Sequence, residues 1–456
     1  MPVPSVHRRS LLKGAAAALS LTAIRASGMQ RFAAAPPYRV ALIGSGWYGK
    51  SDLFKLIQVA PVDVVALADV DKNMLAEAAG LVAQRQASKK EPKQYTDYRK
   101  LLQETKPDIV LIGSPDHWHA LQAIDAIKAG AHVYLQKPIS VDVLEGEAIL
   151  AAARNYNRVV QIGTQRRSTP HLVEAKEKII DSGMLGKVHH VDMCCYYHMR
   201  NGSNPSVQPV PAHLDYDAWT GPAPLRPFDG MPHRGWWRAF MEYGNGIVGD
   251  MCVHMFDATR WMLGLGWPKS ITSHGGIYVD KAAKSNTSDT QHAVFAYDDL
   301  NCVWQHRSWG PPADPEYPWA YILYGEKGTL KCSVFKYEFI PNEKGEKLTG
   351  TPLFEKEKYP EDLKEKDIEL HTASATRRHM RNFINAIEKG GRPVADVAEG
   401  HISTASCILA NISMKLGGRP LVYDPVKKVV VNDAEATALL ARKYRDGYTH
   451  PFKAIS

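Results

Sequence analysis

From residue 38 onward, short apolar runs alternate with amphipathic stretches, and this alternation predicts a parallel sheet with helices on both faces. Runs that are apolar on both faces are typical of buried parallel strands. The sequence therefore predicts a doubly wound α/β domain over residues 36–163. The predicted strands are 40–43, 62–68, 107–112, 132–135 and 159–163, and the predicted helices include 97–104, 120–129 and 143–155.

After the predicted helix 171–181 the pattern changes to period two, which predicts a largely antiparallel open sheet in a second, α+β domain over residues 164–456. Two long segments interrupt this pattern. Residues 200–243 are rich in proline and aromatic residues, and they either contact a sugar or wrap a neighbouring subunit. Residues 343–366 are dense in charge and are predicted to be solvated. The predicted strands are 188–197, 270–279, 292–297, 303–308, 320–324 and 329–332, and helices 375–389 and 397–416 follow.

A glycine-rich turn follows the first strand directly, in the sequence Gly-Ser-Gly-Trp-Tyr-Gly at 44–49. Gly44 permits a tight turn, Gly46 lets the backbone approach a pyrophosphate, and Gly49 lets the next helix pack closely. Asp69 follows the second strand, where a carboxylate binds the ribose hydroxyls and repels a 2′-phosphate. The pattern predicts a Rossmann domain that binds NAD in preference to NADP.

Further polar residues follow the other predicted strands, and ligands of open α/β sheets bind beyond the carboxyl ends of the strands. The two histidines at 117 and 119 either run along the nicotinamide or only cap the helix that follows. The residues predicted to contact the cofactor are Gly44, Ser45, Gly46, Trp47, Tyr48, Gly49, Asp69, Ser114, Pro115, His117, His119, Gln136, Lys137 and Gln165.

Several separate motifs, in order along the chain, resemble the Gfo/Idh/MocA oxidoreductases. This resemblance implies an NAD(P)-dependent enzyme that acts on CH–OH groups of sugars or sugar derivatives and forms a homo-oligomer, either a dimer or a tetramer. The sequence departs from the family's usual Glu-Lys-Pro at Gln136, and the loss of a charge there predicts a lower pKa for Lys137 than in relatives. The motifs lie at 44–49, 114–120, 136–138, 163–167, 244–257, 390–393 and 416–419.

The resemblance assigns the chemistry to Lys137, Asp250 and His254. Asp250 and His254 are four residues apart and share one face if the segment is helical. We assign His254 as the proton acceptor, Lys137 as the hydroxyl binder and proton relay, and Asp250 as the orienting residue. Asp257 makes a metal site conceivable, but a helix or domain contact is favoured and no metal is predicted. The predicted substrate residues are Lys137, Arg166, Tyr197, His198, Trp237, Asp250 and His254.

Residues 1–35 predict export. A twin arginine at Arg8 and Arg9 precedes an apolar stretch that is too short to span a bilayer, as in a twin-arginine signal peptide. This segment holds five of the basic residues and no acidic one, so its removal lowers the net charge from +8 to +3. With so small a net charge, we do not expect the protein to bind nucleic acids. We expect a periplasmic or secreted protein without a membrane span.

The six cysteines lack the spacing of a metal site and are predicted to be buried apolar residues. Because the sequence predicts both export and NAD binding, we expect the cofactor to be loaded before secretion and to stay bound through turnover. Two enzymatic outcomes remain open. They are net oxidation and reduction of sugars, and transient oxidation at C3 followed by elimination of a glycoside. A non-enzymatic sugar-binding or sensing protein is the third alternative.

Overall fold

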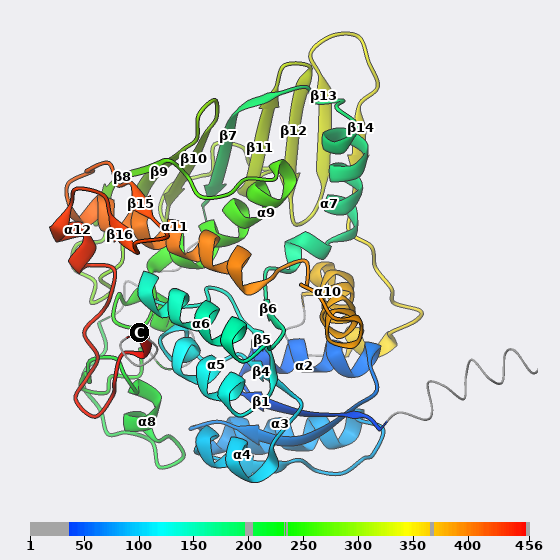
Figure 1. The fold of residues 1–456 in the computed structure, drawn as a ribbon, viewed down its shortest axis with the longest axis vertical. Coiled ribbons are helices and arrows are strands. Elements are labelled where there is room, and N and C mark those ends of the chain that lie inside the picture. The colour runs from blue at the N-terminus through cyan, green and yellow to red at the C-terminus, as the bar shows by residue number, and fades with distance from the viewer. Residues whose placement is uncertain (1–35, 197–203, 232, 234–235, 365–368, 453–456) are drawn as a thin grey trace, which may run out of the picture.

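Two large sheets organise the described chain, and a third sheet of two short strands lies near its C-terminal end (Figure 1). The computed structural model describes residues 36–196, 204–231, 233, 236–364 and 369–452. The predicted signal segment 1–35 lies outside these residues. The predicted fold class, a Rossmann sheet followed by a largely antiparallel sheet, is confirmed.

The N-terminal sheet has six parallel strands in the order β3-β2-β1-β4-β5-β6. The strand order reverses at β1, so a crevice opens between the ends of β1 and β4. Of the six strands in this sheet, only the short edge strand β3 was not predicted from the sequence. The strands are β1 (Tyr38–Ile43), β2 (Val62–Ala68), β3 (Lys93–Tyr95), β4 (Ile109–Ile112), β5 (His132–Leu135) and β6 (Val160–Ile162), and the helices are α2 (Trp47–Val59), α3 (Lys72–Arg85), α4 (Tyr98–Thr105), α5 (His119–Lys128) and α6 (Val143–Asn155).

The C-terminal sheet has eight strands in the order β14-β13-β12-β11-β7-β10-β9-β8. All neighbours are antiparallel except β7 and β10. The six predicted strands are present, while β13 and β14 were not predicted. The strands are β7 (Val188–Cys195), β8 (Ser270–Gly276), β9 (Thr290–Ala296), β10 (Asn301–Arg307), β11 (Trp319–Gly325), β12 (Gly328–Ser333), β13 (Tyr337–Pro341) and β14 (Leu348–Gly350).

The expectation that 343–366 is only a solvated segment was wrong in part. Strand β14 lies within it and pairs with β13. Asp362 is buried, and its carboxylate accepts a hydrogen bond from Lys55 Nζ at 3.0 Å. Asp362, one of the charged residues that suggested solvation, therefore connects this segment to helix α2.

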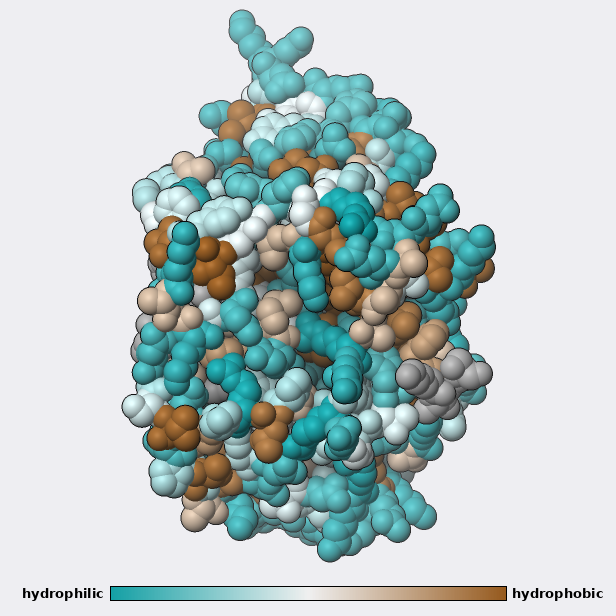
Figure 2. All heavy atoms as spheres, turned by 90° about the vertical axis from the view of Figure 1, so that its left-hand side faces the viewer, coloured by the Kyte–Doolittle hydropathy of each residue, from teal (hydrophilic) through white to brown (hydrophobic). Residues whose placement is uncertain are grey.

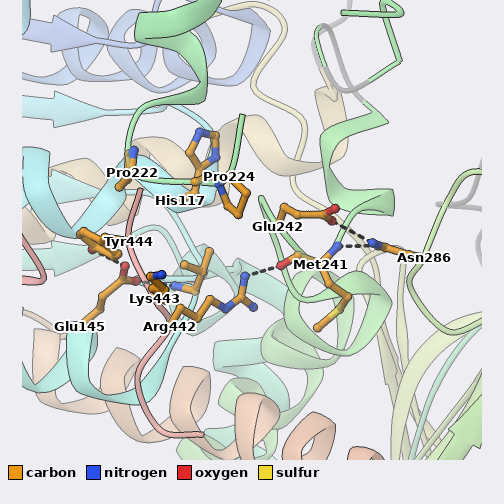
Figure 3. Close-up of a pocket in the computed structure, with 12 residues that line it drawn as sticks. His117, Glu145, Pro222, Pro224, Met241, Glu242, Asn286, Arg442, Lys443 and Tyr444 are labelled. Atoms are coloured by element: carbon orange, nitrogen blue, oxygen red, sulfur yellow. Dashed lines mark hydrogen bonds between the residues drawn. The ribbon is translucent and has the colours of Figure 1, made fainter. Parts of the chain in front are cut away.

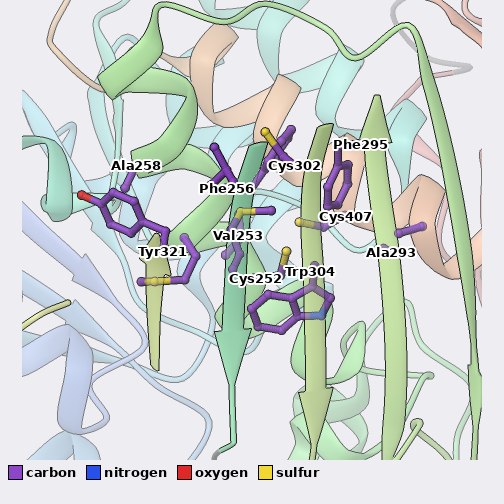
Figure 4. Close-up of a cluster of buried hydrophobic side chains, with 14 of the residues drawn as sticks. Cys252, Val253, Phe256, Ala258, Ala293, Phe295, Cys302, Trp304, Tyr321 and Cys407 are labelled. Carbon is purple, nitrogen blue, oxygen red and sulfur yellow. The ribbon is translucent and has the colours of Figure 1, made fainter. Parts of the chain in front are cut away.

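Aromatic rings and cysteines fill the core between the C-terminal sheet and its helices (Figure 4). Phe256 and Phe295 stack at 4.3 Å between ring centroids, and Trp304 is fully buried beside them. All six cysteines are buried and none forms a disulfide, as predicted.

Two long helices join the domains. Helix α10 (Leu370–Lys389) packs on α2, and α11 (Val397–Lys415) packs on α6 of the first domain and on β8 and α9 (Val253–Leu263) of the second (Figure 1). Both match predicted helices. The shorter elements are η1 (Asp116–Trp118), η2 (Gln165–Ser168), α7 (Pro170–Ala175), η3 (Lys176–Asp181), α8 (Tyr216–Thr220), η5 (Trp237–Ala239), η6 (Val248–Cys252), η7 (Pro360–Leu363), β15 (Tyr423–Asp424), β16 (Val429–Val430) and α12 (Ala434–Ala438).

The described part of 204–243, called the strap below, packs on the N-terminal domain of its own chain. Lys72 N–H donates to His213 O at 2.9 Å, and Asp215 N–H donates to Val70 O at 3.0 Å. The strap also has a small aromatic core of its own, which includes Trp219. It therefore covers the carboxyl end of β2, where Asp69 lies.

Among the described ranges, no helix combines the length and the apolar character that a membrane crossing requires. On the face shown in Figure 2, hydrophobic residues lie in small groups among hydrophilic ones, as is normal for a protein surface.

Candidate active site

A cavity of about 1030 Å³ lies at the carboxyl ends of the parallel strands, with walls from both domains and from the strap. Most of the predicted site residues line it. They are Gly44, Gly46, Trp47, Tyr48, Asp69, Ser114, Pro115, His119, Gln136, Lys137, Arg166, Trp237, Asp250 and His254. We call this cavity the cleft.

The glycine turn at the cleft has the shape that a dinucleotide requires. Gly44 has a φ of +84°, and a Cβ there would lie 2.4 Å from Ser114 N. A Cβ at Gly49 would lie 2.1 Å from Gly44 O, so the close approach of α2 also requires glycine. At Gly46 the nearest atom to such a Cβ is Met74 Cε at 3.5 Å, so space remains above this backbone. With the N–H groups that begin α2, the turn fits a pyrophosphate.

Asp69 lies where its carboxylate can meet the ribose of such a cofactor. Its oxygens accept hydrogen bonds from Ser45 N–H at 2.7 Å, Ser45 Oγ–H at 3.0 Å and Asp71 N–H at 2.9 Å. Burial raises the pKa of Asp69, and these donors oppose the rise. Ser45 therefore acts by holding Asp69.

We expect Asp69→Ala to weaken NAD binding by about tenfold or more, because a charged hydrogen-bond partner is lost. The ratio of NADP to NAD affinity is expected to rise, since the repulsion of a 2′-phosphate also disappears. Calorimetric titration of both cofactors checks this. Asp63→Ala, at the start of the same strand, is the control and should bind NAD as the original protein does. An unchanged NADP-to-NAD ratio in Asp69→Ala would contradict the role of Asp69.

Lys137, Asp250 and Arg238 form a buried ionic cluster at the other end of the cleft. Lys137 Nζ donates to Asp250 Oδ1 at 2.5 Å and to Asp250 O at 3.0 Å. Arg238 Nε lies 3.0 Å from the same Oδ1. Burial would raise the pKa of Asp250, but Arg238 and Lys137 outweigh it, and the pKa falls below its usual value. Asp250 is thus a carboxylate, and it holds the Lys137 ammonium in place.

His254 is a neutral base that faces the cleft. Burial, with repulsion from Lys137, Arg166 and Arg238, holds its pKa well below the usual value. Among the described residues, none forms a hydrogen bond with its Nδ1 atom. Its ring meets Trp319 edge-on, with centroids 5.6 Å apart. A neutral imidazole that lines the cleft can accept a proton from a bound hydroxyl.

Asp250 does not orient His254 as we predicted from the sequence. Its carboxylate bonds to Lys137 and Arg238 instead, so it positions the lysine. The π-helical turn η6 carries Asp250, and α9 begins directly after it with His254 in its first turn. This local change of helix pitch explains why spacing alone misassigned the partner.

Gln136 acts away from the lysine ammonium. Its Nε2 donates to Asp52 Oδ2 at 2.5 Å, beneath the turn, and burial raises the pKa of Asp52 to about 7. Lys137 has a pKa below its usual value, with burial as the largest cause. Desolvation therefore accounts for the lowered pKa more than the amide at 136 does.

Four predicted cofactor residues do not line the cleft: Ser45, Gly49, His117 and Gln165. Gln165 donates through Nε2 to Tyr48 Oη at 2.7 Å and so positions a residue that does. His117 lines a separate cavity of about 270 Å³ with Arg442 (Figure 3), and its Nε2 lies 2.9 Å from Trp219 O. We correct its assignment to a structural role. The predicted substrate residues Tyr197 and His198 lie outside the described residues.

Arg238 lies in the segment considered for sugar contact but was not among the predicted site residues, and its role stands out only once its partners are known. Its guanidinium lies between Asp250 and, at 3.9 Å, Asp116 Oδ1. Burial raises the pKa of Asp116 to about 8, so this carboxyl holds a proton near neutral pH and the charge of Arg238 acts on Asp250. Its position beside Trp237 in an aromatic-rich segment was the only signal. The cleft residues that were also missed include Tyr196, Trp319 and His371.

Asp257 makes a structural contact, as favoured from the sequence. Both of its oxygens accept hydrogen bonds from Arg167, at 2.8 and 2.9 Å, and Ser403 donates a third. The cluster of Asp142, Glu145 and His450 has metal-ligand composition. However, Asp142 and Glu145 already accept hydrogen bonds as the capping box of α6. The described residues thus give no support for a metal centre.

Two family matches cover the chain in the order of its domains. Residues 38–164 match the oxidoreductase family's NAD-binding Rossmann fold, and residues 170–303 match its C-terminal alpha/beta domain. The chain belongs to the Gfo/Idh/MocA oxidoreductase family. Its N-terminal domain is therefore an NAD-binding domain, which agrees with the geometry of the turn and of Asp69.

Curated relatives match over part of their length. The uncharacterized oxidoreductase YrbE of Bacillus subtilis is 25% identical over 223 residues, which are 49% of this chain and 53% of YrbE. Inositol 2-dehydrogenase of Salmonella typhimurium is 32% identical over 151 residues, or 33% of this chain and 43% of the relative. The matched segments thus span about half the length of these relatives.

Solved structures share the fold across both domains. An oxidoreductase from Agrobacterium radiobacter, in complex with NAD+, L-tartaric acid and magnesium, has a TM-score of 0.63 at 16% identity, covering 84% of this chain and 98% of that one. Levoglucosan dehydrogenase, in complex with NADH and levoglucosan, has a TM-score of 0.62 at 17% identity, covering 87% and 100%.

Proposed function

We propose that this protein is an exported oxidoreductase that oxidises or reduces a hydroxyl of a sugar or sugar derivative, with NAD held tightly. The observation that carries the proposal is the cleft, which joins the dinucleotide turn to Lys137, Asp250 and His254. Relatives named inositol 2-dehydrogenase and levoglucosan dehydrogenase support a carbohydrate substrate.

The residues divide the chemistry as follows. The bound nicotinamide supplies a hydride acceptor for the substrate carbon. His254 accepts the hydroxyl proton, because its ring lines the cleft and is neutral. Lys137, fixed by Asp250, donates a hydrogen bond to the oxygen as negative charge develops on it. With a nicotinamide bound in the cleft, the hydride of the CH–OH group would have an acceptor separate from the one that takes its proton.

The strap supports tight retention of the cofactor. It joins the N-terminal domain at Val70 and Lys72, beside Asp69. Its residues Trp219 and Trp237 line the cleft, so the strap forms part of the wall around a dinucleotide bound there. Retention suits the proposed export, whose twin-arginine signal at Arg8 and Arg9 lies outside the described residues.

Acid denaturation of the purified protein tests the retention directly. We expect about one equivalent of nicotinamide cofactor to be released. Exhaustive dialysis before denaturation separates retained cofactor from free cofactor. Release of none would contradict the bound-cofactor proposal.

A sugar panel then tests the reaction, with absorbance of the reduced cofactor as the signal. Reduction by a sugar supports the oxidoreductase. Free sugar released from an aryl glycoside without net cofactor change would identify the elimination route instead. Binding of sugars without either response would replace the enzyme with a sugar-binding protein.

A further inference from the structure

Arg166 is a buried cation that has no hydrogen-bond or ion-pair partner among the described residues. Its side chain comes from η2, directly after β6, and only 3% of the residue is exposed. Among the residues that the structure describes, none accepts a hydrogen bond from its guanidinium or lies within ion-pair distance, and its Nε atom is enclosed without a partner. Because an unpaired buried charge is costly, it needs an explanation.

The next residue shows what a structural arginine looks like in this place. Arg167 is equally buried, but it donates to both oxygens of Asp257, to Glu399 Oε2 at 3.1 Å and to Val394 O at 3.1 Å. Arg166 makes none of these contacts and points into the cleft instead. The protein thus supplies hydrogen-bond acceptors for Arg167, whereas the guanidinium of Arg166 is left to bind a ligand.

The charge around Arg166 favours an anion. At this end of the cleft, Arg166, Lys137 and Arg238 face two carboxylates, Asp250 and Glu369. Asp250 is already shared by Lys137 and Arg238, and Glu369 stays beyond 4.0 Å of Arg166 with its side chain 40% exposed.

The nearby histidines add no positive charge. Burial and Arg166 lower the pKa of His371 to about 4, and the pKa of His254 is lowered as well. One buried positive charge therefore remains uncompensated at the substrate end of the cleft.

Trp319 places this charge beside the reacting group. The Arg166 guanidinium lies 5.0 Å from the Trp319 ring centroid, and the His254 ring meets the same tryptophan edge-on. A single small ligand on Trp319 can thus reach both Arg166 and His254. The planar guanidinium fits a carboxylate with two parallel hydrogen bonds.

We propose that the substrate is an acidic sugar, whose carboxylate binds Arg166 while one of its hydroxyls lies at Lys137 and His254. This assignment rests on the proposed function and adds its substrate class. A sugar phosphate fits less well, because a dianion would meet a single unpaired arginine with Glu369 nearby.

Matched pairs of acidic and neutral sugars test the proposal on the full chain with its cofactor. The pairs are D-glucuronate with D-glucose, D-galacturonate with D-galactose, and D-gluconate with D-glucitol, with glucose 6-phosphate added. We expect at least one acid to exceed its neutral partner in kcat/KM by about 10- to 100-fold, as for a charge-assisted hydrogen bond. Arg166→Gln should remove this preference, and Arg166→Lys should restore part of it.

A binding measurement without turnover separates this inference from the proposed function. Calorimetry in the Lys137→Met variant should show at least one of these acids binding more tightly than its neutral partner, and Arg166→Gln should abolish the difference. Equal binding and turnover of the acidic and neutral sugars would overturn the inference while the oxidoreductase stands. Absence of turnover for every sugar, with selective acid binding retained, would overturn the oxidoreductase alone.

Two further outcomes would also overturn the inference. A preference for glucose 6-phosphate over every acid would replace the carboxylate with a phosphate. Loss of bound NAD from Arg166→Gln would show that the arginine serves the cofactor, and the cofactor content of each variant is therefore measured first.

Discussion

Replacement of Lys137 by methionine is expected to lower the rate of hydride transfer by about 10³-fold while the cofactor stays bound. The ammonium is the donor that Asp250 holds toward the cleft, and methionine keeps its length but not its charge. The fold should survive, because Arg238 remains as a partner for the Asp250 carboxylate. Single-turnover absorbance of the reduced cofactor, with cofactor content after acid release, measures both effects.

Lys178→Met is the control for this prediction. Its ammonium is exposed and pairs with Glu174 on the surface, so the rate should not change. A Lys137→Met protein that reacts within threefold of the original rate would show that the lysine has no part in the chemistry. A protein that has lost its cofactor would assign Lys137 to cofactor binding instead.

Replacement of Arg167 by methionine is expected to lower the free energy of unfolding by about 3–5 kcal/mol, because it leaves a buried carboxylate without its main partner. The guanidinium bonds both oxygens of Asp257 on α9, and it also reaches Glu399 on α11. This pair ties the segment after β6 to the helix that carries His254. Guanidinium unfolding, followed by tryptophan fluorescence, measures the change.

Arg166→Met provides a matched comparison one residue away. Since this guanidinium has no partner among the described residues, its loss should cost less than about 1 kcal/mol. Equal destabilisation by the two variants would mean that Arg166 also has a structural role. We therefore expect replacement of Arg167 to lower stability and replacement of Arg166 to change substrate preference.

Local patterns allowed much of the fold to be predicted. Burial on both faces marked the parallel strands, and the helices α6 and α11 begin at the predicted residues. Strand β14 was missed because it is a short edge strand with no buried residue and no clear alternation, and the neighbouring strand β13 was missed with it. The π-helical turn at Asp250 also left no mark in the hydrophobic pattern.

The sequence by itself determined the dinucleotide turn, because the positive φ of Gly44 and the tight packing at Gly49 are local demands that only glycine meets. The family resemblance of its motifs also predicted Lys137 and His254, and both residues line the cleft. Tertiary structure alone decided which charges are paired. Asp250 lies 113 residues from Lys137, and Arg167 finds Asp257 at a separation of 90, while Arg166 finds no described partner. Pairing of this kind depends on packing between segments that are far apart in the chain, and two adjacent arginines look alike until that packing exists.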